Sequence, residues 1–340
     1  MADYSLTPHG MPFVSKKEET HSHMSSVSSF VDTKTFKHNQ RKGVMPTYEP
    51  AIYIPTLIVM WKHVSKTAYQ LMFIIGFADG VILTIGVIPS GVMSLTGVVF
   101  CSYPTPFYIN ACLIGGIWVF STEMSVVLAL YRCFELSKLV TSVGNNHSSL
   151  TALAADWFFK EKRSSVWISL SLLHSITIAS FGAPLLYSPI FGSMLLNPHA
   201  GYIEDVDEKF YNLHFKLYNM ALFSVGVVLF IAFVYLIRSQ NKLNSYGPSR
   251  QILAAQKKSL VQAVIMCSCF AVSITYWGIV FSGRQLPRIA TFIGMTITLC
   301  AHGVPGLLYL SMNKTVNDSF WKLVGIKAKS TVSIAIQYEE

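Results

Sequence analysis

The sequence predicts an all-α membrane protein, a seven-transmembrane helix bundle followed by a short cytoplasmic amphipathic helix. The composition, six helix-length apolar runs and the placement of the basic residues support this prediction. The 340 residues are 52% hydrophobic and 13% charged, and the mean hydropathy is +0.45. A soluble domain is nearer a quarter charged. A water-soluble fold of this size could not cover its surface with so few charges.

The chain begins with a polar arm, residues 1–50, which we expect to be disordered because it offers little apolar surface to bury. The first helix is truncated or marginal. Only Ile52 to Trp61 is convincingly apolar, whereas crossing a bilayer takes about 20 residues. Prolines, among them Pro50 and Pro55, interrupt this segment.

The following runs are apolar on every side, as lipid-facing helices must be. They complete a transmembrane domain over residues 51–312, with spans at about 68–93, 108–131, 165–190, 215–237, 259–281 and 290–312. Pro184 and Pro305 fall within spans and are expected to kink them.

Basic residues orient the bundle. Alternate connections carry sixteen lysines and arginines against three in the others, and the basic set faces the cytoplasm. This pattern argues against nucleic acid as a partner. Seven spans would leave the N-terminus outside the cell and six would leave it inside, and both remain open. Residues 313–326 have the period of an interfacial amphipathic helix, and 327–340 form a flexible cytoplasmic tail.

The span 108–131 organises the bundle, and Tyr131 and Arg132 lie where it meets the cytoplasm. Ser121 and Arg132 share one face, being close to three turns apart. Glu123 lies about half a turn away and is expected to meet a different helix. Arg132 could hold an inactive packing and then be released to a partner, or it could simply reach the lipid interface.

Asp79 is an acid inside the second span, where such residues face protein or water. It is either a cation or proton site, or a structural pin. Gly76 and Gly80 beside it allow a neighbouring helix to approach closely. His174 and His302 lack the spacing of a zinc site and are expected to make polar contacts. We find no pattern of a catalytic site, and the sequence implies no cofactor or metal and no enzyme.

Several segments together resemble a rhodopsin-like seven-helix receptor, and more narrowly a nematode serpentine chemoreceptor of class T. They are YIPTLIVMWK, YQLMFIIGFADG, CSYPTPFYINA, LALYRCFEL and GLLYLSMNKTV. The resemblance implies a chemosensory receptor in the plasma membrane of sensory neurons, often in the cilium. Its expected partners are an environmental small molecule, a heterotrimeric G protein and the lipid bilayer.

The resemblance also assigns residues. Arg132 matches the family's arginine for G-protein coupling, and Asp79 its second-helix acid. Tyr131 stands where receptors of this type carry an acid, so Glu135 is the possible substitute. Pro305 and Tyr309 match the switch in the last helix, although Tyr309 follows the proline by four residues instead of three. A pocket between helices three, five, six and seven would use Asn110, Trp118, Tyr218, Tyr276 and Trp277.

A ligand-gated channel or transporter is the alternative function, with Asp79 and Glu123 lining a path through the membrane. Transporters often show related halves, and this sequence has no internal repeat. The location of the two termini relative to the membrane would separate the two hypotheses.

Overall fold

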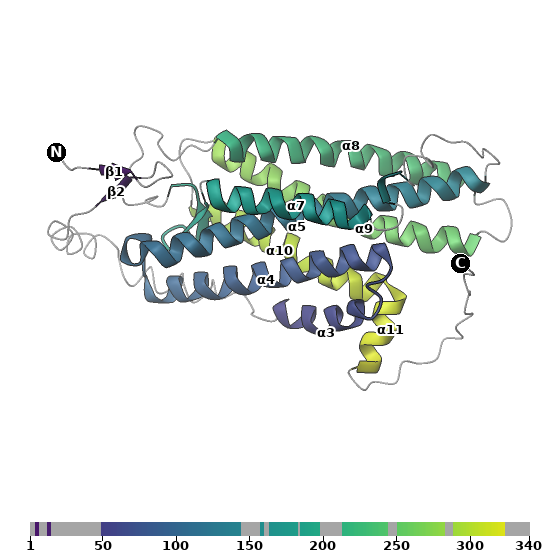
Figure 1. The fold of residues 1–340 in the computed structure, drawn as a ribbon, viewed down its shortest axis with the longest axis horizontal. Coiled ribbons are helices and arrows are strands. Elements are labelled where there is room, and N and C mark those ends of the chain that lie inside the picture. Colours follow the sequence, from purple (N-terminus) through teal and green to yellow (C-terminus); the bar gives the residue numbers. More distant parts are fainter. Residues whose placement is uncertain are drawn as a thin grey trace.

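The computed structural model describes residues 4–6, 12–14, 49–143, 157–159, 163–182, 184–197, 213–243, 250–282 and 288–323. Helices make up most of the described structure, and the long ones run side by side as a bundle (Figure 1). They are α3 (Glu49–Trp61), α4 (Thr67–Thr96), α5 (Pro104–Val143), α7 (Arg163–Phe181), α8 (Leu213–Leu243), α9 (Arg250–Ser282), α10 (Arg288–Met312) and α11 (Lys314–Leu323).

Six helices among the described residues, α4, α5, α7, α8, α9 and α10, are long and apolar enough to cross a membrane. The helix α3 has only 13 residues, a length of about 20 Å against a hydrocarbon core of about 30 Å. It lies beside one half of α4 (Figure 1). These findings confirm a helical membrane bundle whose first helix is short. Pro55 lies inside α3 without ending it.

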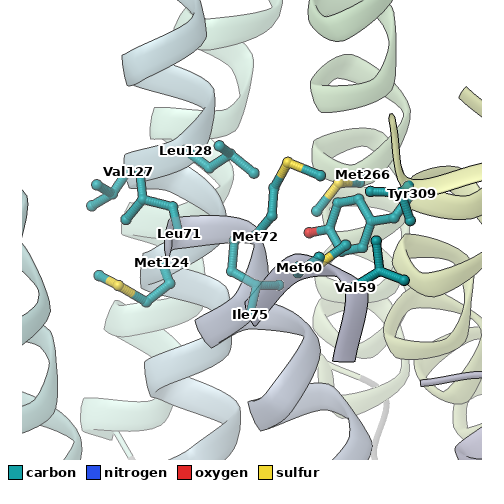
Figure 2. Packing of buried hydrophobic residues seen from close by; sticks show 11 residues of the cluster. Val59, Met60, Leu71, Met72, Ile75, Met124, Val127, Leu128, Met266 and Tyr309 are labelled. Carbon is teal, nitrogen blue, oxygen red and sulfur yellow. The ribbon is translucent and has the colours of Figure 1, made fainter. Parts of the chain in front are cut away.

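The helix α5 is central, because it packs against α4, α7, α8 and α9. Near one end of the bundle, helices from both ends of the sequence share a core. Figure 2 shows the Tyr309 ring among the side chains of Met60, Met72 and Met266. All four residues are at most 2% exposed. Methionine is flexible enough to fill irregular space around a rigid ring, so this core can join α3, α4, α9 and α10 despite their unequal lengths.

The helix α7 is shorter than predicted. It ends at Phe181, so the predicted span 165–190 is wrong over residues 182–190. Pro184 follows the helix without kinking it. Gly182 and Pro184 together explain the stop, because neither favours continuation of a helix. The apolar residues beyond them belong to a β-hairpin, which a hydropathy window cannot distinguish from a helix.

That hairpin pairs β3 (Leu186–Ser188) with β4 (Ser193–Leu195) in antiparallel register. It packs against α5, α10 and the 3-10 turn Phe100–Ser102. Tyr187 shares a hydrogen bond of 2.5 Å with Ser94 near the end of α4, and Thr291 of α10 donates to the Phe191 carbonyl. The hairpin therefore covers the end of the bundle at which α4 ends and α10 begins.

At the opposite end, helices extend beyond the predicted spans. The helix α5 continues past Arg132 to Val143. The predicted loop 238–258 is largely helical, since α8 runs to Leu243 and α9 begins at Arg250. Apolar run length marks where a helix leaves the hydrocarbon, and polar residues continue the helix into the interface.

The helix α11 lies within the predicted interfacial segment and at an angle to the bundle (Figure 1). The Asn313 side-chain oxygen accepts a hydrogen bond from the Val316 amide, which caps its first turn. Val316 is fully buried in the core shared with α3 and α10.

Part of the N-terminal arm differs from the disorder we expected, because β1 (Tyr4–Leu6) pairs with β2 (Pro12–Val14). The remainder of that arm up to Glu49, and the predicted tail 327–340, lie outside the described residues.

Candidate functional site

A polar cluster at the centre of the bundle joins three helices. Ser121 of α5 donates a 2.5 Å hydrogen bond to Asp79 Oδ1 on α4, and His302 Nδ1 of α10 lies 2.8 Å from the same oxygen. All three side chains are at most 1% exposed. The ring of Phe270 on α9 meets the His302 ring edge-on at 5.2 Å. Asp79 therefore ties α4, α5 and α10 together through one carboxylate oxygen.

The second side-chain polar atom of Asp79 and of His302 differs from the first. Asp79 Oδ2 and His302 Nε2 are buried and make no hydrogen bond to a described residue. The Asp79 carboxylate thus has one oxygen bonded to two neighbouring helices and one without a described partner. Its role as a structural pin, or as a cation or proton site, stays a prediction. Sequence reasoning identified both residues as intramembrane polar groups, but it did not pair them, since 223 positions separate them.

Tyr53 of α3 reaches into the backbone of α10 beside Pro305. Its hydroxyl donates to the His302 carbonyl and accepts a hydrogen bond from the Gly306 amide at 3.1 Å. In an uninterrupted helix these two backbone groups are the ones that bond to each other. The tyrosine hydroxyl is thus inserted into the helical hydrogen-bond ladder next to the proline, where a helix is already weakened.

Glycines on two helices make room for the Tyr53 ring. A Cβ added at Gly306 would lie 2.9 Å from the ring, and one added at Gly76 or Gly80 would lie 3.6 Å from Tyr53. The predicted close approach of a helix at Gly76 and Gly80 is therefore made by α3. Sequence analysis did not identify Tyr53 as a site residue.

Arg132 lies inside α5 and contacts Glu135 one turn later. The guanidinium donates to Glu135 Oε2 at 2.9 Å, and the Tyr131 hydroxyl donates to Glu135 Oε1 at 2.6 Å. Arg132 also reaches the Met72 sulfur at 3.8 Å, beside the core that contains Tyr309. Glu135 thus contacts both Tyr131 and Arg132, and its role as a substitute for the missing acid stays a prediction. The Arg132 side chain is only 12% exposed.

Glu123 meets a different helix from Ser121, as its position predicts. Its Oε1 lies 2.6 Å from His174 Nδ1 on α7. Two of the predicted pocket residues lie close by, because Tyr218 of α8 contacts both the His174 ring and the Trp118 ring at 5.9 Å. His174 was absent from the predicted site.

The remaining predicted pocket residues lie elsewhere. Tyr276 donates to the Ala290 carbonyl at 2.9 Å, and Trp277 donates to Thr298 at 2.8 Å, so both pack against α10. Asn110 is half-buried near the start of α5. An apolar hollow of about 270 Å³ lies between α8 and α9, and the five predicted pocket residues are not among those that line it. Their role in a common ligand pocket stays a prediction.

No described residues bring three histidine, cysteine, aspartate or glutamate side chains close enough to hold a metal ion.

The chain matches a family model described as serpentine type seven-transmembrane G-protein-coupled chemoreceptor Srt, over residues 49–333. It is also similar to Serpentine receptor class T-55 of Caenorhabditis elegans, with 18% identity over 283 residues that cover 81% of this chain and 72% of that receptor. The match takes in the bundle, the Asp79 cluster, the arginine of α5 and α11. The chain belongs to the Srt family of serpentine chemoreceptors.

Proposed function

We propose that this receptor binds an environmental small molecule and activates a heterotrimeric G protein at the end of the bundle that carries Arg132. Membership of the chemoreceptor family supports this function in general terms. The single observation that carries it is the contact of Arg132 with Glu135, because a held guanidinium at the end of the central helix can be released to a partner.

The resting contact is local to α5. Glu135 holds Arg132 along the helix while Met72 covers it from α4. A fully exposed ion pair at this helical spacing contributes only about 0.2–0.5 kcal/mol. The Arg132 and Glu135 side chains are less exposed than such a pair, at 12% and 28%. A weak restraint suits a switch, because a modest difference in partner affinity between two states can then shift the population.

Ligand binding would act on the packing of α8 and α9 against α5. These three helices share a core around Ala129, Leu229 and Leu260. A molecule that contacts Trp118 and Tyr218 would change how α8 lies on α5. The expected location is the plasma membrane, in sensory neurons and their cilia as for the class.

Nucleotide exchange on a co-expressed G protein tests the proposal. Arg132→Ala should reduce ligand-stimulated exchange at least about tenfold, as loss of a charged hydrogen-bonding group at an interface does. Glu135→Gln should raise exchange in the absence of ligand, since it weakens the restraint on Arg132. Arg163→Ala removes an exposed arginine at the start of α7 and serves as the matched control. Equal exchange by Arg132→Ala and the control, at equal surface expression, would contradict the coupling role.

A further inference from the structure

A pair of ionisable side chains faces the bilayer between α5 and α7. The side chains of His174 and Glu123 are 44% and 19% exposed in the bundle, at a depth where the surrounding helices are apolar. Ionisable groups that face hydrocarbon are costly and mark binding or transport sites more often than packing sites. The pair lies outside the Asp79 cluster and is not needed to hold that cluster together.

Aromatic rings adjoin this pair through Tyr218 of α8. The Trp118 ring lies 6.0 Å from Phe215 and 5.9 Å from Tyr218, and Tyr218 lies 5.9 Å from His174. Tyr218 is close enough to Glu123 for an electrostatic interaction. The Tyr218 hydroxyl is buried beside the Glu123 carboxylate. The pair is therefore bordered by a tyrosine ring and its hydroxyl on the side of α8.

We propose that Glu123, His174, Trp118 and Tyr218 form a binding site for lipophilic organic amines that arrive through the bilayer. This inference rests on the proposed chemosensory function and names the class of ligand. His174 contacts Oε1 of Glu123, and the carboxylate is the acceptor for the ammonium group. The faces of the tryptophan and tyrosine rings attract the same cation, and the carbon chain of the amine remains among apolar side chains.

The route through the bilayer follows from the packing. The β3–β4 hairpin covers the end of the bundle away from Arg132, and Leu186, Met194 and Leu195 of this hairpin are buried. The helices α7 and α8 each pack on α5, and the face of α7 that carries His174 is exposed. A molecule dissolved in the membrane therefore meets Glu123 and His174 directly, without displacing the hairpin.

Octylamine and octanol form a matched pair of probes for this site. Their binding is followed as ligand-dependent stabilisation of the full chain in nanodiscs of phosphatidylcholine. Octylamine should raise the unfolding midpoint in a saturable manner, and octanol, with the same chain and no charge, should not. Glu123→Gln should weaken octylamine binding about tenfold or more, as expected for a lost charge-assisted hydrogen bond. Asp318→Asn makes the same carboxylate-to-amide change on α11, outside the site and the Arg132 contact, and should leave octylamine binding intact.

Equal stabilisation by octanol, or equal octylamine binding by Glu123→Gln and the unsubstituted receptor, would overturn the inference. Should Glu123→Gln fail to fold, Trp118→Leu takes its place. It removes a ring and no hydrogen bond of the pair, so it should weaken octylamine binding, and unchanged binding would overturn the inference equally. No G protein is present in this experiment. In the separate exchange assay, equal exchange by Arg132→Ala and Arg163→Ala would reject the coupling role and leave the octylamine site standing.

Discussion

The substitution Tyr53→Phe removes one oxygen atom and tests whether the short helix α3 stabilises α10. The substitution keeps the ring against the glycines of α4 and α10 and deletes only the hydroxyl that bonds to His302 and Gly306. Both hydrogen bonds are buried and join positions about 250 residues apart in sequence.

The magnitude follows from those two bonds. A buried hydrogen bond contributes about 0.5–1.5 kcal/mol net in water-soluble proteins, and about 0.6 with a maximum near 1.7 between membrane helices. Losing both should lower the free energy of unfolding by about 1–3 kcal/mol. The loss of stability stays moderate because the His302 carbonyl and the Gly306 amide can bond directly to each other once this turn of α10 becomes regular. Tyr53→Ala should cost about 3–5 kcal/mol, since it also leaves a cavity that glycines cannot fill.

Unfolding in detergent is conveniently followed with a thiol-reactive fluorescent dye, because Cys133 is a free and buried cysteine. Denaturant titration of the same variants supplies the free energies. Tyr69→Phe is the matched control, as its hydroxyl makes a single, longer hydrogen bond of 3.3 Å to Asn313. A Tyr53→Phe receptor no less stable than the Tyr69→Phe receptor would refute the idea that the inserted hydroxyl supports α10.

Three further predictions use the same unfolding measurements. Gly306→Ala should destabilise by about 1–3 kcal/mol, because its Cβ would lie 2.9 Å from a buried ring. A Cβ added at Gly91 meets nothing within 4 Å, so Gly91→Ala should leave stability unchanged or raise it. Equal destabilisation by Gly306→Ala and Gly91→Ala would contradict the close packing of Tyr53 on Gly306. Ser121→Ala should cost about 1.5–3 kcal/mol by removing a hydrogen bond to a carboxylate, and a loss below about 0.5 kcal/mol would show that Asp79 does not depend on it. Burial raises the pKa of Tyr187. The unfolded chain therefore ionises first, and stability should fall as the pH rises above about 10; Tyr187→Phe should reduce that fall, and an unchanged pH profile would exclude Tyr187 as a contributor.

The sequence predicted the elements whose cause is local. Apolar run length identified six spans, and the ten apolar residues from Ile52 to Trp61 indicated a helix too short to cross. Helical spacing separated Glu123 from Ser121, and the structure places them against different helices. Glu135 could be found because it lies one turn from Arg132 on the same helix.

Contacts between distant parts of the chain could not be predicted in this way. Nothing local in the sequence indicates that Tyr53 reaches the backbone beside Pro305, or that His302 is the partner of Asp79. The β3–β4 hairpin was missed for a different reason. Its first residues fall in an apolar run that was assigned to a span, although Gly182 and Pro184 signal that the helix has already ended.

The length of α5 sets a geometric condition on any protein that reads the state of Arg132. Eleven residues of continuous helix follow this arginine, ending with Val143, a length of about 16 Å. A protein that contacts Arg132 would therefore lie alongside these last turns of α5 and not across the end of the helix.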